Sequence, residues 1–226
     1  MLDATAPGAT PARPADPDAR AIVLDGYARA SLAYRGDTFP LEGSAYAYWL
    51  SRIVPRIPAG GRVLDLGCGN GVPVARALAP HFEVTGVDLS PVQVERARVL
   101  VPAARFVCAD MSALDAPAGS FDAVLAFYSL IHLPLAEHAP MLARIAGWLA
   151  PGGHVLAVVG QEPWTGVEEN WRGVSGARMY YSQAGIARYR EWLAAAGLAI
   201  VEQGREPRRG NPGYAVLIAR AGGASS

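Results

Sequence analysis

Short apolar stretches alternate with helical patterns along most of the chain. Five stretches have the length and composition of buried strands: 62–66, 82–87, 104–109, 121–127 and 154–159. Apolar side chains recur at helical spacing in three segments between them: 72–79, 91–101 and 138–149. Because alternating strands and helices form parallel βαβ units, this pattern predicts a doubly wound α/β fold with a parallel sheet.

Two more helical patterns precede the alternation, at residues 20–34 and 44–54. They predict a helical region at 20–58 that either covers a ligand as a lid or packs against the edge of the sheet. Residues 1–19 are rich in Ala, Pro and Asp and have no periodicity, so we expect them to form a disordered tail.

The chain has a different character after the fifth predicted strand. Residues 160–182 hold four aromatic side chains without a regular period, which predicts an irregular aromatic insert within a domain that spans 59–222. A helix is expected at 183–196. Two strands at 198–203 and 213–219, joined by an Arg-rich turn, predict a hairpin at the sheet edge.

Composition excludes several classes of partner. The 226 residues are 51% hydrophobic and have a formal net charge of zero, which gives no overall attraction to nucleic acid or to an anionic membrane. No apolar run approaches the roughly 20 residues that cross a bilayer. Cys68 and Cys108 have no partners at metal-ligand spacing, and no Asp, Glu or His set has that spacing, so we expect no metal ion. Without a recognisable secretory signal, the two thiols favour a reducing, cytoplasmic location.

The end of the first predicted strand carries the most specific motif of the chain, D-x-G-x-G-x-G from Asp65 to Gly71. Three alternating glycines between a strand and a helix allow positive φ angles and let a ligand approach bare backbone. In the dinucleotide fingerprint G-x-G-x-x-G, the third glycine would fall at position 72, which is Val72 here. The spacing therefore indicates a cofactor turn of another kind.

Each of the next two predicted strands is followed by an acid, Asp88 or Asp110. Since the carboxyl ends of parallel strands lie at one edge of a sheet, Asp65, Asp88 and Asp110 are expected to come together there. A carboxylate at Asp88 suits both hydroxyls of a ribose, and Asp110 suits the amine of an adenine beside the backbone N–H of Met111. Asp65 is placed to steady the glycine turn or to bind an amino-acid ammonium group.

Five stretches of the chain resemble the motifs of one family. Motif I is matched by Val63–Gly71, motif II by 84–90, motif III by 106–111, motif IV by 121–133, and the turn before strand five by 149–153. Over about residues 43 to 220 the chain is similar to the class I S-adenosylmethionine-dependent methyltransferases. The resemblance implies a Rossmann-like, doubly wound sheet of seven strands, mostly parallel with an antiparallel last strand and helices on both faces.

The resemblance also implies S-adenosylmethionine as the cofactor and S-adenosylhomocysteine as its product. It assigns the methionine part to Gly67, Gly69 and Gly71, the ribose to Asp88, and the adenine to Asp110 with Met111. Phe127 or Tyr128 is expected beside the sulfonium, because the face of an aromatic ring attracts a cation. The other predicted cofactor contacts are Tyr34, Asp65, Cys68, Asn70, Leu89 and Ser90.

Two residues after the fourth predicted strand are the catalytic candidates, His132 and Tyr128. His132 is placed to act as general base toward a hydroxyl acceptor, and a place in the shell around the cofactor is the alternative. The aromatic insert is expected to form the acceptor pocket, with Trp171 and Tyr180 as its favoured members. The alternative is a surface flap that packs its own tryptophans.

The favoured function is transfer of a methyl group to O, N or S of a small aromatic or apolar molecule. Methylation of RNA or protein is the first alternative, although Phe127–Leu130 replaces the Asn/Asp-Pro-Pro-aromatic signature of many nucleic-acid amino methyltransferases. A protein that binds S-adenosylmethionine without methylating, such as a cyclase, is the second, because its cofactor motifs would be the same. We expect neither nucleic-acid nor membrane partners, and a monomer and a homodimer both fit the sequence.

Overall fold

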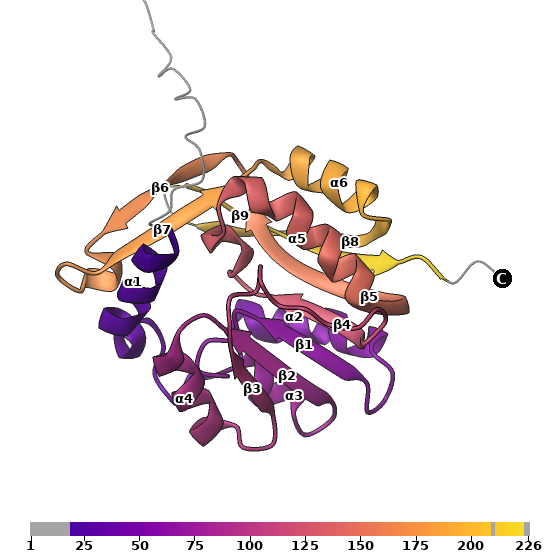
Figure 1. Ribbon diagram of the computed structural model, residues 1–226, viewed down its shortest axis with the longest axis horizontal. Helices are drawn as coiled ribbons and strands as arrows, with labels where there is room; N and C mark the ends of the chain where they lie inside the picture. The colour runs from indigo at the N-terminus through magenta and orange to yellow at the C-terminus, as the bar shows by residue number, and fades with distance from the viewer. Residues whose placement is uncertain (1–18, 209–210, 224–226) are drawn as a thin grey trace, which may run out of the picture.

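One sheet of seven strands forms the centre of the computed structural model, which describes residues 19–208 and 211–223 (Figure 1). The strands lie in the order β3-β2-β1-β4-β5-β9-β8. Their bounds are Arg62–Leu66 (β1), Glu83–Asp88 (β2), Arg105–Cys108 (β3), Phe121–Ala126 (β4), Leu149–Gly160 (β5), Leu198–Arg208 (β8) and Asn211–Ala221 (β9).

The chain runs outward from β1 to β3 and then returns to β4 on the other side of β1. Strands β1 to β5 pair in parallel, whereas β9 is antiparallel to both β5 and β8. The predicted fold class, a doubly wound and mostly parallel seven-stranded sheet with an antiparallel last strand, is confirmed. Ligands of such sheets bind where the strand order reverses, which here is at the carboxyl ends of β1 and β4.

Helices cover both faces of the sheet. One face packs against α2 (Ala45–Ile53), α3 (Val74–Leu78) and α4 (Pro91–Leu100), and the other against α5 (Leu135–Trp148) and α6 (Ile186–Ala195). Neighbouring side chains of one strand lie on opposite faces of the sheet. Val63 packs in the core on the side of α2, α3 and α4, and Leu64 packs in the core on the side of α5 and α6. Because both faces are buried, the strands are apolar throughout instead of alternating with polar residues. Short 3-10 turns lie at Val54–Arg56 (η1), Leu130–His132 (η2) and Trp171–Gly173 (η3).

The helix α1 (Ala19–Tyr34) lies apart from both layers, beside α4 and the strand β7 (Figure 1). Its buried side forms a third apolar core with residues that include Trp171 and Met179. Gly26 permits this close packing, because a Cβ there would clash with the backbone carbonyl oxygen of Arg178 in β7.

The prediction that residues 160–182 are irregular is wrong. Strands β6 (Trp164–Glu169) and β7 (Arg178–Gln183) form a separate antiparallel hairpin, with η3 between them. A two-stranded hairpin is marginally stable alone in water, and α1 supplies the apolar surface on which this one packs. That partner lies far away in the sequence, so the local pattern did not reveal it.

Most other predicted elements agree with the structure to within a few residues. The hairpin of β8 and β9 is confirmed, and both strands are longer than predicted. The predicted tail lies outside the described residues except for Ala19, the first residue of α1, and Arg209 and Gly210 of the predicted turn also lie outside them. Over the described parts of the chain, no helix is both long enough and apolar enough to cross a membrane.

Gly26→Ala is expected to lower the free energy of unfolding by about 1–3 kcal/mol, because the added methyl group forces α1 away from β7. Gly147→Ala is the matched control, since no heavy atom lies within 4 Å of a Cβ at this helical glycine of α5. There the change should stabilise the protein by up to about 1 kcal/mol. Urea unfolding of both variants measures the difference, and equal stabilisation would contradict the packing of α1 on β7.

Candidate functional site

Three cavities lie side by side at the carboxyl ends of β1 to β4. The α1 cavity, of about 60 Å³, lies between α1 and the ends of β2 and β3. The glycine cavity, of about 40 Å³, borders the turn at 67–70, and the aromatic cavity, of about 240 Å³, borders η3 and β7. Asp88 lines the first two cavities and Tyr34 lines the last two, so the three are compartments of one site.

The glycine turn after β1 has the backbone that its sequence predicts. Gly67, Gly69 and Gly71 have φ angles of 71°, 55° and 76°. A Cβ at Gly67 would clash with Ser129 after β4, whereas a Cβ at Gly69 would meet no atom within 4 Å. The turn therefore lies against the end of β4 and opens toward the cavities at Gly69.

The third glycine has a different place from the one predicted. Gly71 is absent from the residues that line the three cavities, and a Cβ there would lie 3.1 Å from Cζ of Phe106. The absence of a side chain at Gly71 therefore lets the turn pack closely against Phe106. Cys68 and Asn70 do line the glycine cavity, and the Asn70 side chain accepts a hydrogen bond of 3.3 Å from the N–H of Val72.

Asp88 connects the glycine turn to the end of β2. Its carboxylate accepts hydrogen bonds from the backbone N–H groups of Gly69, at 2.8 Å, and Ser90, at 2.9 Å. Burial raises the pKa of Asp88, and these two donors oppose the rise. A carboxylate offers about four lone-pair positions, so Asp88 keeps acceptor capacity for a ligand. Leu89 and Ser90 line the α1 cavity beside it.

Two buried groups of opposite charge face the glycine cavity with unused polar atoms. Oδ2 of Asp65 and Nη1 of Arg35 have no hydrogen-bond partner among the described residues. Asp65 is 2% exposed and Arg35 is 9% exposed. Because burial of an unpaired charge is costly, the pair indicates a ligand that brings both an ammonium and a carboxylate group.

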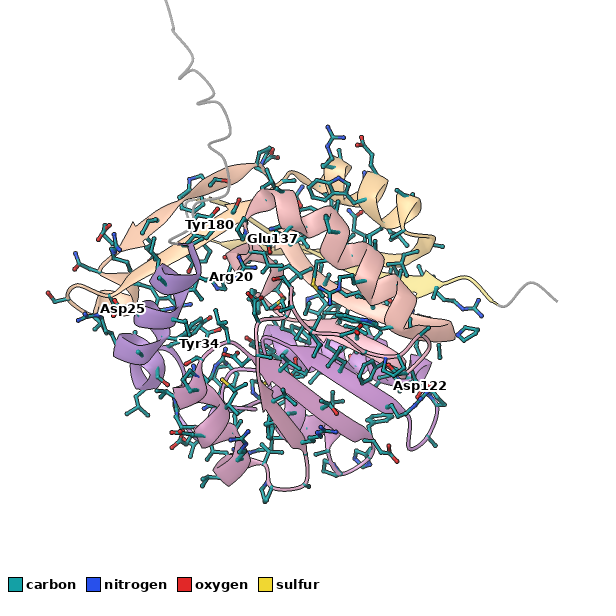
Figure 2. The ribbon with its side chains drawn as sticks, viewed as in Figure 1. Arg20, Asp25, Tyr34, Asp122, Glu137 and Tyr180 are labelled. Carbon is teal, nitrogen blue, oxygen red and sulfur yellow. The ribbon has the colours of Figure 1, made fainter. Side chains whose placement is uncertain are left out.

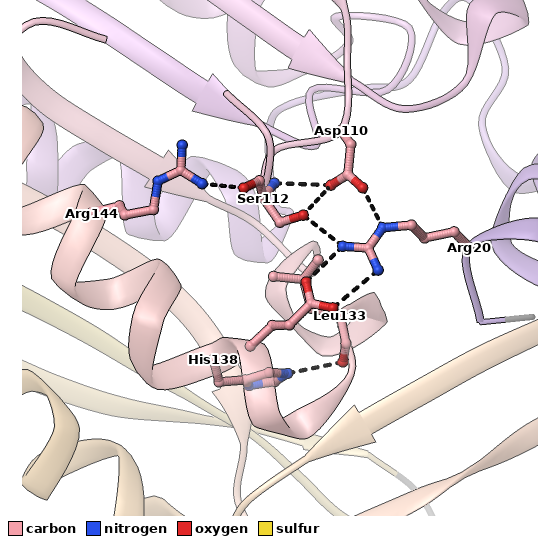
Figure 3. Close-up of polar contacts among 7 residues, drawn as sticks. Arg20, Asp110, Ser112, Leu133, His138 and Arg144 are labelled. Carbon is pink, nitrogen blue, oxygen red and sulfur yellow. Dashed lines mark hydrogen bonds and ion pairs between the residues drawn. The ribbon is translucent and has the colours of Figure 1, made fainter. Parts of the chain in front are cut away.

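Asp110 is held by an arginine that sequence reasoning missed (Figure 3). Arg20 of α1 contacts the Asp110 carboxylate, donates to both carboxylate oxygens of Glu137 at 3.0 and 2.6 Å, and donates to Oγ of Ser112 at 2.6 Å. Burial alone would raise the pKa of Asp110, but the bonds from Arg20 and Ser112 hold it below its usual range. Figure 2 shows Arg20 and Glu137 pointing toward each other between α1 and α5. Asp110 and Met111 line the α1 cavity, as predicted for one ligand-binding region.

His132 lies between the α1 cavity and the aromatic cavity. Burial lowers its pKa to about 4, so the ring is neutral at pH 7. Nδ1 lies 2.7 Å from the carbonyl oxygen of Tyr180 and must carry the hydrogen, because a carbonyl only accepts. Nε2 therefore presents a lone pair, with the hydroxyl of Tyr27 at 3.4 Å.

Tyr128 follows β4 in a left-handed conformation, with φ 55°, which is uncommon for a residue other than glycine. The conformation brings its ring to the wall between the glycine cavity and the aromatic cavity, next to Phe127 in the former. The hydroxyl donates to Oε2 of Glu206 in β8, and Oε1 of Glu206 has no partner among the described residues. Glu206 carries no sequence motif, and only the pairing of β8 with β9 brings it here.

The hairpin contributes one of its two predicted pocket residues. Trp171 lines the aromatic cavity, stacks on Tyr34 at 5.1 Å between ring centroids, and donates from Nε1 to the hydroxyl of Tyr181 at 2.9 Å. The prediction for Tyr180 does not hold, because Tyr180 is absent from the residues that line the aromatic cavity and its side chain is buried in the α1 core. Tyr181 lines the cavity instead, since side chains alternate along a strand. Within the described ranges, no cluster of three or more His, Cys, Asp or Glu residues could hold a metal ion.

Asp65→Asn is expected to stabilise the ligand-free protein at pH 8. Burial, with the charge of Asp88, raises the folded pKa of Asp65 from 3.8 to about 7. The folded state therefore binds the proton more tightly, and stability falls as pH rises from about 4 to 7, by a few kcal/mol at most. Urea unfolding at pH 5 and pH 8 should show a clearly larger gain at pH 8 than at pH 5.

Asp122→Asn is the control with the opposite sign. The bonds from Arg62 outweigh burial and lower the pKa of Asp122, so its ionised form stabilises the fold and the variant should lose stability at pH 8. Equal losses in the two variants would contradict the unpaired state of Asp65.

Residues 63–153 match the family model described as a methyltransferase domain. The chain is 42% identical over 104 residues to the 27-O-demethylrifamycin SV methyltransferase of Amycolatopsis mediterranei, an alignment that covers 43% of this chain and 38% of that protein. The chain spans less than half the length of several curated relatives that it matches in this way.

Solved structures extend the likeness over nearly the whole chain. The 1,6-didemethyltoxoflavin-N1-methyltransferase of Burkholderia thailandensis, with 1,6-didemethyltoxoflavin and S-adenosylhomocysteine bound, aligns with a TM-score of 0.67 and 26% identity over 97% of this chain and 93% of that chain. The cyclase SpnF has a TM-score of 0.67 at 22% identity over 92% of this chain and 98% of its own, which shows a shared fold.

The segment matched by the family model begins in β1 and ends in β5, so it contains the ends of β1 to β4 and the turns that border the cavities. The structural relative from Burkholderia thailandensis holds S-adenosylhomocysteine, the form that the cofactor takes after methyl transfer. Fold, matched segment and relatives agree that residues 63–153 form a methyltransferase domain and that the chain is similar to the class I S-adenosylmethionine-dependent methyltransferases.

Proposed function

We propose that this protein transfers the methyl group of S-adenosylmethionine to an oxygen, nitrogen or sulfur atom of a small aromatic molecule. One observation carries the proposal: Oδ2 of Asp65 and Nη1 of Arg35, both without a hydrogen-bond partner among the described residues, flank the glycine cavity, and that cavity shares a wall with the larger aromatic cavity. The zwitterionic methyl donor would bind in the glycine cavity, and an aromatic methyl acceptor would bind in the adjoining aromatic cavity.

The polar groups of the glycine cavity fit the methionine part of the cofactor. Oδ2 of Asp65 would accept from the ammonium group, and Nη1 of Arg35 would donate to the carboxylate. Gly67, Cys68, Gly69 and Asn70 would border the same part with backbone that leaves room for it. A ligand without charged groups would leave Oδ2 of Asp65 and Nη1 of Arg35 without a charged partner.

The α1 cavity fits the adenosine part. Asp88 would accept from the ribose hydroxyls beside Leu89 and Ser90, and Asp110 with Met111 would face the adenine. Arg20 is a positioning residue in this proposal. Its bonds to Asp110 and Glu137 fix the Asp110 carboxylate that would accept from the adenine amine, and they hold α1 over the cavity. On this ground we assign the lid role within the region 20–58 to α1, whereas α2 packs against the sheet.

When bound, S-adenosylmethionine supplies a methyl group that is already activated on a positively charged sulfur. The chain's own residues then have to align the acceptor, exclude water and remove a proton where the acceptor is a hydroxyl. The rings of Phe127 and Tyr128 would lie near the positive charge and favour it. His132 is the favoured base, because Nε2 is unprotonated at pH 7 and the residue borders both the α1 cavity and the aromatic cavity.

The acceptor class follows from the walls of the aromatic cavity, where Trp171, Tyr34 and Tyr181 present apolar rings. These rings favour a planar small molecule over an RNA or protein segment. The test is incubation of the protein with methyl-labelled S-adenosylmethionine and pooled metabolites or cell extract. Label in small molecules supports the proposal, label in RNA or protein supports the first alternative, and no label supports a cofactor-binding protein without transfer.

Asp88→Asn is expected to weaken S-adenosylmethionine binding by about 10²-fold, because the change removes the charge from hydrogen bonds to two hydroxyls. Isothermal titration calorimetry measures the dissociation constant. Asp25→Asn is the matched control, since Asp25 lies on the outer side of α1 and pairs with Arg29 (Figure 2). Unchanged binding in the Asp88 variant would refute its assignment to the ribose.

His132→Gln is expected to lower kcat on a hydroxyl acceptor by about 10²-fold while the cofactor affinity stays near that of the wild type. Because its pKa is about 4, the wild-type rate should be independent of this group from pH 6 to 9. The exposed His81 provides the control variant His81→Gln. A rate close to wild type in the His132 variant would place the residue in the cofactor shell without a catalytic role.

A further inference from the structure

We propose that the acceptor is a small aromatic acid, whose negative group pairs with Arg172 at the wall of the aromatic cavity. This inference rests on the proposed function, because it concerns the acceptor compartment of the same site. It adds the charge of the acceptor, which the aromatic walls alone do not define.

The aromatic cavity has cationic groups in its wall and no acidic group. Its lining consists of aromatic side chains, Ile131, the neutral His132 and two arginines, Arg35 and Arg172. None of the lining residues is an aspartate or a glutamate. A cavity whose wall has two guanidinium groups and no acidic side chain favours an anionic ligand over a neutral or cationic one.

Arg172 is held at the cavity by aromatic rings. Its guanidinium carbon lies 5.2 Å from the ring centroid of Tyr34 and 5.4 Å from that of Trp171. The residue has a left-handed backbone, with φ 56°, inside the turn between β6 and β7. A left-handed arginine is strained, and such strain is concentrated at ligand-binding sites.

No hydrogen bond or ion pair joins the Arg172 side chain to another of the described residues. Glu168 and Glu169 lie close by in the same hairpin, yet neither forms an ion pair with it. Its charge nevertheless reaches the cavity, because it adds to burial in lowering the pKa of His132. The same field would stabilise an acceptor anion beside the base.

The cofactor accounts for one of the two arginines. Arg35 lines the glycine cavity as well, where it would pair with the single carboxylate of S-adenosylmethionine. Arg172 does not line that cavity, so its charge is left for the acceptor. The cavity of about 240 Å³ lies just below the roughly 300–1,000 Å³ of drug-sized pockets, which suits a molecule of one or two rings.

The inference is tested without turnover by measuring, with isothermal titration calorimetry, the binding of small aromatic probes to the protein loaded with S-adenosylhomocysteine. Two pairs of probes distinguish the sources of negative charge: 2-naphthoate against 2-naphthamide for a carboxylate, and ionised 4-nitrophenol against 4-nitroanisole for a hydroxyl. In at least one pair the anion should bind about tenfold or more tightly than its neutral partner, as expected for a charge-assisted contact. The pair with the larger preference identifies the anionic group.

Variants assign that preference to one residue. Arg172→Gln should abolish the tenfold preference, and Arg172→Lys should retain part of it. Arg178→Gln is the matched control, because Arg178 is an exposed arginine of the same hairpin that lines none of the three cavities.

Three outcomes would overturn the inference: equal binding of anion and neutral partner, an unchanged preference in Arg172→Gln, or no binding of any anion to protein that still binds S-adenosylhomocysteine. Failure of the proposed function would show differently, as absence of label transfer or loss of S-adenosylhomocysteine binding itself.

Discussion

The contact between the glycine turn and the end of β4 is the constraint on which the site depends. At Gly67 any side chain would clash with Ser129, and the backbone N–H groups of Gly67 and Cys68 both donate to the carbonyl oxygen of Val87, at 2.7 and 3.1 Å. The turn is therefore fixed between the ends of β2 and β4, the two strands that flank β1. Bare backbone at Gly69 then faces the cavities, and a carboxylate at the end of β2 can bond to its N–H.

Buried charge is the second feature that organises the site. Asp65 and Arg35 are both buried with unused polar atoms, and Asp88 has a raised pKa despite two backbone donors. A fold selected only for stability would pair these groups with each other or replace them, because unpaired buried charge is costly. Their arrangement is typical of a site whose ligand completes the pairing, at some expense in the stability of the free protein.

The helix α1 encloses the site by contacts at both of its ends. Near its first residue, Arg20 bonds across to Asp110 and Glu137, and near its last, Tyr34 stacks on Trp171. Gly26 lets the middle of the helix lie directly on β7. The same helix thus stabilises the β6–β7 hairpin and forms a wall of each cavity, which couples the aromatic cavity to the α1 cavity.

The sequence by itself determined the parallel sheet, the glycine turn and the acids at the strand ends, because local period and strand order are sufficient to place Asp65, Asp88 and Asp110 at one edge. It also indicated His132, Tyr128 and Trp171, which follow directly from strands or lie in an aromatic-rich segment. Only the tertiary structure decided the roles of Arg20, Arg35, Arg172 and Glu206, and the exchange of Tyr180 for Tyr181. These side chains reach the site through packing between distant segments, α1 on β7 and β8 beside β9, and no local pattern records which segments meet.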